Sequence, residues 1–126
     1  LVGDRLPDGT ETAAFLRQAK ASFMHLQTMN SPESVDELRK YLTPAMFEAI
    51  KADVAANKDT AEFPTLNAEV VEAATDGDQY IASVRFHGMV SESLNAPEQP
   101  FEELWHFVKP TAAGSLKWLV AGIQQI

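Results

Sequence analysis

The residues of this sequence best suited to acid–base or metal chemistry are three histidines, His25, His87 and His106. No two of them have a metal-ligand spacing such as HxxxH or HxH, and no carboxylate cluster joins them locally. The chain has no cysteine, which excludes disulfides, thiolate nucleophiles and cysteine-ligated zinc. We therefore predict no metal and no cofactor. An isolated histidine is a base only when a partner orients it, so each is expected to have a structural role.

The strongest polar grouping combines Arg85 and His87, which alternate along a predicted strand, with Glu103 or Glu102 on the neighbouring strand. With His106, such side chains could line a pocket and place an acid–base pair in it. The alternative is a set of cross-strand ion pairs on a solvated sheet face. Serine-hydrolase chemistry is not predicted because there is no nucleophile elbow, and there is no glycine-rich phosphate loop. No catalytic residue is therefore assigned.

Two tryptophans, Trp105 and Trp118, fall on adjacent predicted strands and are candidates for the wall of an apolar cavity. With Phe23 and Phe107 they form the candidate ligand pocket, which would accept an acyl chain or a hydrophobic peptide. The alternative is that these aromatic side chains simply pack in the core.

Helices are expected in the first half of the chain, over about residues 11–29, 35–42 and 44–57. Ser34 and Glu37 have the spacing of a capping box, and Thr43-Pro44 is a typical helix start. The first helix has an apolar stripe at three- and four-residue spacing: Phe15, Leu16, Ala19, Phe23, Leu26 and Met29.

Strands are expected from Thr65 onward, with a turn at Asp76-Gly77 and further strands over about 79–92, 101–110 and 117–125. Gly88 is predicted to mark a bulge or bend. The order predicts an α+β fold in which one curved four-stranded antiparallel sheet wraps the long helix. The last strands are apolar on both faces, so we expect a second copy of the domain to cover the outer one.

Size and charge limit the classes of partner. The 126 residues predict one domain over residues 11–126, after a flexible lead-in over residues 1–10. With 18 acidic and 10 basic side chains the net charge is -8, so nucleic acid is not an expected partner. No apolar run approaches the roughly 20 residues that span a bilayer. The chain begins at Leu1 without methionine, so we expect a targeting or anchoring segment upstream.

The chain resembles the bacterial branch of the Tim44-like domain family over about residues 12–125. The C-terminal resemblance lies in Phe101-Glu-Glu-Leu-Trp-His-Phe-Val-Lys109 and Trp118-Leu-Val-Ala-Gly-Ile-Gln-Gln125. Further matching segments are Phe15-Leu-Arg-Gln-Ala-Lys-Ala-Ser-Phe23, Leu38-Arg-Lys-Tyr-Leu-Thr-Pro-Ala-Met-Phe47 and Val84-Arg-Phe-His-Gly88. The resemblance implies an NTF2-like cone with three N-terminal helices. It also implies association with a bacterial inner membrane through a missing N-terminal segment.

The expected function is therefore a non-enzymatic binding domain that holds a lipid or other hydrophobic ligand, or a translocase-type protein partner. Two alternatives stay open. One is a small-molecule enzyme of the NTF2-like type with an acid–base pair in the cone cavity. The other is a purely structural dimerisation module with a filled cone.

Overall fold

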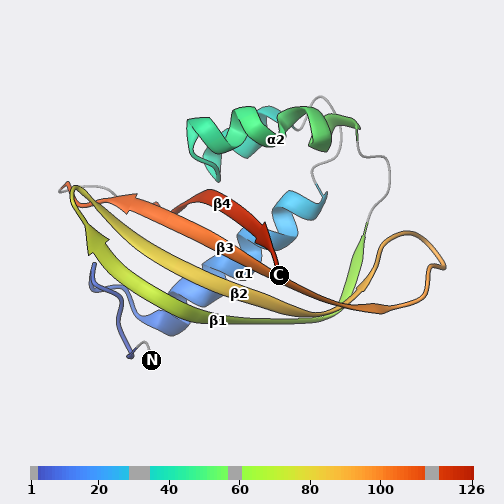
Figure 1. The fold of residues 1–126 in the computed structure, drawn as a ribbon, viewed down its shortest axis with the longest axis horizontal. Coiled ribbons are helices and arrows are strands. Elements are labelled where there is room, and N and C mark those ends of the chain that lie inside the picture. The colour runs from blue at the N-terminus through green and yellow to red at the C-terminus, as the bar shows by residue number, and fades with distance from the viewer. Residues whose placement is uncertain (1–2, 29–34, 57–60, 113–116) are drawn as a thin grey trace.

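The computed structural model describes residues 3–28, 35–56, 61–112 and 117–126. Within these residues, two α-helices and a short 3₁₀-helix come first: α1 (Thr12–Thr28), η1 (Val35–Lys40) and α2 (Pro44–Ala56). Four strands follow: β1 (Glu62–Asp76), β2 (Gln79–Ser91), β3 (Gln99–Pro110) and β4 (Leu119–Gln125). The expected α+β class is confirmed, and α1 lies along one face of a curved sheet (Figure 1).

The helices begin close to the predicted positions, but the second is a 3₁₀-helix. Its exposed ion pairs join residues three apart, with Lys40 Nζ 3.0 Å from Glu37 and Arg39 3.6 Å from Asp36. Three-residue spacing aligns side chains in a 3₁₀-helix, so these pairs suit that geometry. Thr43 caps α2 as expected, because its hydroxyl accepts a hydrogen bond from a backbone N–H at 3.2 Å. The predicted roles of Met29 and Ser34 lie outside the described residues.

The sheet is an antiparallel meander in the order β1-β2-β3-β4, and it ends with the predicted C-terminal hairpin. The irregularity expected at Gly88 lies opposite it, on β1, where the register shifts between Glu62 and Thr65. Gly88 has φ +154°, and a Cβ there would come within 2.1 Å of the Thr65 carbonyl oxygen. The position requires glycine because the two backbones approach too closely for any side chain.

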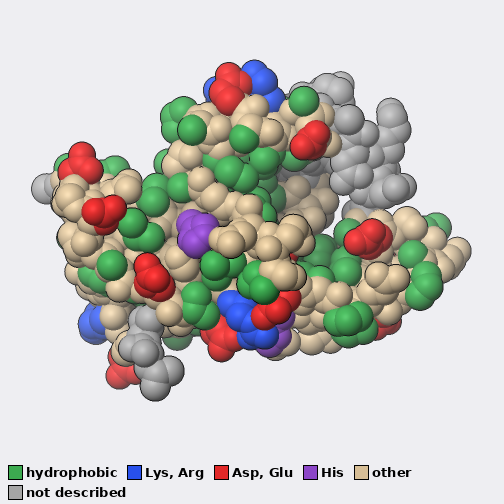
Figure 2. Space-filling view, in the orientation of Figure 1, with side chains coloured by type: hydrophobic (Ala, Val, Ile, Leu, Met, Phe, Trp, Pro, Cys, Tyr) green, Lys and Arg blue, Asp and Glu red, His purple; other side chains and the backbone are tan. Residues whose placement is uncertain are grey.

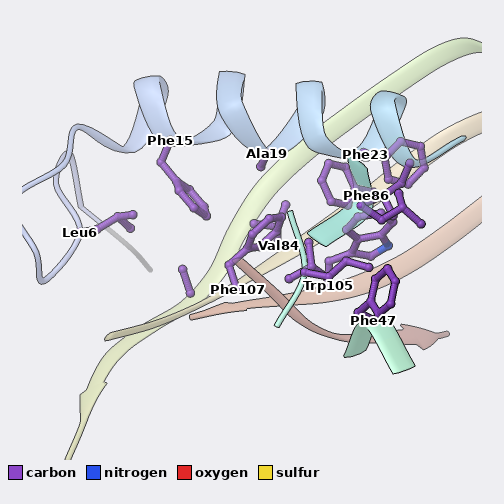
Figure 3. Close-up of a cluster of buried hydrophobic side chains, with 14 residues drawn as sticks. Leu6, Phe15, Ala19, Phe23, Phe47, Val84, Phe86, Trp105 and Phe107 are labelled. Atoms are coloured by element: carbon purple, nitrogen blue, oxygen red, sulfur yellow. The ribbon is translucent and has the colours of Figure 1, made fainter. Parts of the chain in front are cut away.

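The core lies between α1 and the inner face of the sheet, which is the face that packs against α1 (Figure 3). The stripe of α1 points to this face through Phe15, Ala19 and Phe23, which are at most 2% exposed. Phe15 meets Phe107 with ring centroids 5.4 Å apart. From α2, Phe47 reaches the same cluster and is 2% exposed. Burial of these large side chains is the main stabilising contribution to the fold.

The N-terminal segment is not the loose lead-in that the sequence suggested. Over residues 3–10 it packs on the domain: Leu6 is 3% exposed and belongs to the core. Asp8 forms a buried salt bridge with Lys109 on β3, at 2.8 Å, and also accepts hydrogen bonds from Thr10. Its turn-forming residues predicted flexibility, but the side chains of Leu6 and Asp8 hold the segment on the domain. The salt bridge joins residues more than a hundred positions apart in the sequence.

The edge of the sheet at β4 is covered by the segment that joins η1 to α2. Leu42 forms a parallel bridge with Val120. The Val120 N–H donates to the Tyr41 carbonyl at 2.7 Å, and the Thr43 N–H donates to the Val120 carbonyl at 3.0 Å. This contact protects part of an edge strand and fixes the position of α2 over β4.

Candidate functional site

Three of the four aromatic residues predicted to line a ligand pocket pack against one another in the core. Phe23, Trp105 and Phe107 are 0%, 1% and 1% exposed. The Phe23 ring lies 4.9 Å from that of Trp105. The fourth, Trp118, is half-buried at the edge of α1, where its ring lies 5.1 Å from Phe15. The interior between α1 and the sheet is therefore filled at these positions, and space for a ligand has to be sought nearer the surface.

An open hollow of about 430 Å³ lies at the end of the core where α1 finishes and β1 begins. Its floor contains Phe63 of β1 and Phe101 of β3, whose rings are 5.2 Å apart. Both rings also contact Phe23, at 5.0 and 5.9 Å, so the floor is continuous with the core. Figure 2 shows a recess at this place, beside the lobe formed by the loop that joins β2 to β3. We call this space the end hollow.

The rim of the end hollow is polar. It contains Gln27, Glu92, Ser93, Glu103 and Gln125, with Ala61 and Val90 completing the wall. Glu103 accepts a hydrogen bond from Trp105 Nε1 at 2.9 Å and from Gln125 Nε2 at 3.0 Å. Both oxygens of this carboxylate are therefore engaged in holding neighbouring side chains. An aromatic floor with a few polar groups around its mouth is the usual composition of a binding pocket.

The predicted acid–base grouping lies elsewhere, on the outer face of the sheet. Arg85 forms ion pairs with Glu69 on β1 and Glu102 on β3, and these hydrogen bonds, first that of Glu102, raise the pKa of its guanidinium. His87 Nε2 lies 3.7 Å from the same Glu69. Glu103 points to the inner face and has no part in this cluster, because neighbouring residues of a strand face opposite sides. Figure 2 shows basic, acidic and histidine side chains together on this face.

The arrangement matches the alternative of cross-strand ion pairs rather than an acid–base pair inside the cone. The Arg85, His87 and Glu102 side chains are 32–35% exposed. A guanidinium held by two carboxylates stays charged and cannot exchange a proton near neutral pH. The ion pairs of this cluster link β1, β2 and β3 on the outer face of the sheet.

His106 also lies on the outer face, within a short hydrogen-bond chain. Its Nδ1 is 2.8 Å from the Ser83 hydroxyl, and its Nε2 is 3.3 Å from Gln124 Oε1. Because the Gln124 oxygen can only accept, Nε2 is the donor in that contact. These contacts link β2, β3 and β4 across the outer face, from the buried Ser83 hydroxyl (4% exposed) to an exposed Gln124 amide. The third histidine, His25, lies beside Tyr41, with ring centroids 4.8 Å apart and ring planes inclined at 46°.

Phe63 and Phe101 are the site residues that sequence reasoning missed. Phe63 lies before Thr65, where the sequence predicts the first strand to start, but β1 begins at Glu62, three residues earlier than expected. Phe101 was recognised as an apolar strand residue without a role. Phe63 and Leu66 are three positions apart rather than two, because the bulge at this point interrupts the two-residue period of the strand, so alternation does not reveal Phe63.

Within the described parts of the chain, no group of three or more histidine, aspartate or glutamate side chains is arranged to hold a metal ion. Among the helices described, none is long and apolar enough to cross a membrane.

A family model described as Tim44-like domain matches residues 4–125. The chain belongs to the Tim44-like family. A search of curated proteins gives no match. Among solved structures, the chain is similar to the intermembrane space region of the chloroplast protein ARC6, with a TM-score of 0.54 and 12% sequence identity. That likeness covers 87% of this chain and 96% of the other. At this identity it shows a shared fold for the Tim44-like domain.

Proposed function

We propose that this Tim44-like domain is a non-enzymatic binding module that works at a membrane and holds a hydrophobic ligand or an apolar group of a protein partner in the end hollow. The observation that carries the proposal is the aromatic floor formed by Phe63 and Phe101, open to solvent and continuous with the core. Both side chains are only partly buried, so a ligand can remove further apolar surface from water there. Membership of the family supports the membrane setting.

The first experiment is native mass spectrometry of the purified domain, followed by the same sample under denaturing conditions. The expected result is an additional lipid-sized or metabolite-sized mass that disappears on denaturation. In parallel, the neutral apolar dye N-phenyl-1-naphthylamine is titrated into the protein and its fluorescence is followed.

Two matched variants test whether the dye binds in the end hollow. Phe101→Glu places a charge on the floor of the end hollow and is expected to abolish most of the fluorescence increase. Val71→Glu places the same charge at an exposed position of β1, where the parent side chain is 47% exposed, and is expected to leave dye binding unchanged. A clean apo mass together with equal dye binding by both variants would overturn the assignment of the end hollow.

Two finer expectations belong to the same proposal. The family supports an NTF2-like cone anchored through an upstream segment. A hydrophobic stretch of about 20 residues in that segment would support the anchor, and a hydrophilic upstream sequence would contradict it.

The partly buried apolar residues of the outer face, among them Ile81, Leu104 and Val108, support a homodimer. A dimer mass in native spectra that Leu104→Glu converts to monomer is the expected result, and a concentration-independent monomer would contradict it.

A further inference from the structure

A second hollow, distinct from the end hollow, opens on the side of the molecule where α1 faces the strand edge. It has a volume of about 440 Å³. We call it the side groove. One wall is a single face of α1, and the other is made by the end of η1 and the residues that enter β4. The residues that matter for its chemistry are Ala21, His25, Lys40, Tyr41, Lys117 and Trp118.

The charge of the side groove is opposite to that of the chain. Among the residues that the structure describes, two lysines and one histidine line it and no aspartate or glutamate does, although the chain as a whole has a net charge of -8. Lys40 keeps one contact to Glu37 at 3.0 Å, which raises the pKa of its ammonium group and leaves its other N–H donors for a ligand. The side groove therefore attracts negatively charged groups, although the rest of the chain repels them.

One wall residue carries a buried hydrogen-bond donor with no acceptor. Trp118 Nε1 is buried and has no partner among the described residues. Trp105 Nε1, by contrast, donates to Glu103 at 2.9 Å. An unpaired buried N–H is unfavourable, and an indole nitrogen can only donate, so the group that satisfies it must bring an acceptor oxygen. The positive charge of the side groove therefore favours an anion, and the acceptor oxygens of such a ligand are also the kind of group that this donor lacks.

The walls are held in place before any ligand arrives. Tyr41 is fixed by its backbone hydrogen bond with Val120, and its ring contacts His25 in a tilted arrangement with centroids 4.8 Å apart. Trp118 rests edge-on against the buried Phe15 at 5.1 Å. Flat aromatic and small apolar surfaces between two cations suit an extended peptide whose aliphatic stems lie on the walls and whose carboxylates reach the lysines.

We infer that the side groove binds an acidic peptide segment of a protein partner, with its carboxylates directed to Lys40 and Lys117 beside the Trp118 ring. A peptide meets only the groove, whereas an anionic membrane surface would also meet the acidic remainder of the chain and be repelled by it. The inference does not depend on the end hollow, since none of the described residues lines both spaces.

The test uses the whole chain labelled with ¹⁵N and a capped hexaglutamate peptide as the probe, with capped hexaglutamine as the uncharged control. The protein has two tryptophans, so the spectrum contains two indole N–H signals that report on the two environments separately. Hexaglutamate is expected to shift the indole signal of Trp118, which lines the groove, and to leave that of Trp105 in place, and hexaglutamine is expected to shift neither.

Lys40→Gln and Lys117→Gln are each expected to weaken hexaglutamate binding about 2- to 5-fold, as for exposed charge pairs, and added salt to weaken it further. Lys51→Gln is the matched control, because Lys51 lies on α2 outside the groove. This variant is expected to bind hexaglutamate as tightly as the parent protein does. A Trp118 signal that stays in place, or an equal loss in the Lys51 variant, would overturn the inference. So would a Trp118 shift caused by vesicles of anionic phospholipid or by inorganic phosphate but not by hexaglutamate.

Discussion

The salt bridge between Asp8 and Lys109 offers the clearest test of how the N-terminal segment is held on the domain. The two charged atoms are 2.8 Å apart, and their side chains are 2% and 14% exposed. Asp8→Asn removes the negative charge with almost no change of shape. It leaves the Lys109 ammonium in a largely buried position without its anionic partner, next to the Trp118 ring at 5.9 Å.

The magnitude follows from this burial. Removing one partner of a fully buried pair costs about 3–5 kcal/mol, because the remaining charge has lost its compensation. Since Lys109 retains 14% of its exposure and can recover some hydration, we expect Asp8→Asn to lower the free energy of unfolding by about 2–3 kcal/mol. Replacing both charges, in Asp8→Asn with Lys109→Met, removes the uncompensated cation. The double variant is expected to return to within about 1 kcal/mol of the parent.

Urea unfolding of the parent, the two single variants and the double variant gives the coupling directly. Glu11→Gln is the control, since its pair with Arg5 spans 4.0 Å with both side chains 65% exposed and should contribute less than about 0.5 kcal/mol. If Asp8→Asn were no more destabilising than Glu11→Gln, or if Lys109→Met failed to rescue it, the bridge would not be what holds the segment.

The same bridge predicts a dependence on pH. Burial alone would raise the pKa of the Asp8 carboxyl, but hydrogen bonds from Lys109 and Thr10 outweigh it and lower the pKa below its ordinary value of 3.8. A lowered folded-state pKa means that the contribution is complete above the ordinary value and is lost as pH falls through the folded value. Between neutral pH and pH about 4 the parent should therefore keep this contribution, and the difference between parent and Asp8→Asn should shrink only in stronger acid.

Three further predictions address the fold. Gly88→Ala should lower the free energy of unfolding, measured in urea, by about 3 kcal/mol or more, because the added Cβ would meet the Thr65 carbonyl. Gly77→Ala should lower it by about 1–2 kcal/mol, because that position has open space but a φ of +62°. Equal losses would contradict the close approach of the backbones at Gly88. Thr43→Ala should remove the cap of α2 and cost about 1 kcal/mol, and Thr43→Ser should restore it. Arg85→Gln should lower the urea midpoint of unfolding slightly at low salt, because it removes the ion pairs to Glu69 and Glu102. The difference from the parent should fade near 1 M salt, where the screening length is about 3 Å. A loss that does not depend on salt would argue against ion pairing.

Most of the fold could be predicted because its signals are local. The stripe of α1, the Thr43-Pro44 start of α2 and the turn at Asp76-Gly77 each depend on residues within a few positions of one another. The start of β1 was missed because its bulge interrupts the alternation that marks a strand. The 3₁₀ form of η1 was missed because its spacing is also compatible with a short α-helix.

The candidate sites depended on information that sequence spacing does not carry. Whether Phe23, Trp105 and Phe107 line a cavity or fill it is decided by how closely α1 approaches the sheet. Whether Glu102 or Glu103 meets Arg85 is decided by cross-strand register, where a shift of one residue reverses the face. The pairing of Asp8 with Lys109 joins residues that no local pattern relates.

The sequence by itself thus determined the element order, the α+β class and the family, because periodicity, caps and turns act over a few residues and a family resemblance is itself a property of the sequence. The tertiary structure alone decided which aromatic side chains are core, where the hollows open and which charges are neighbours. The physical reason is that packing and ion pairing depend on distances between atoms far apart in the chain, and those distances exist only once the sheet has closed on α1.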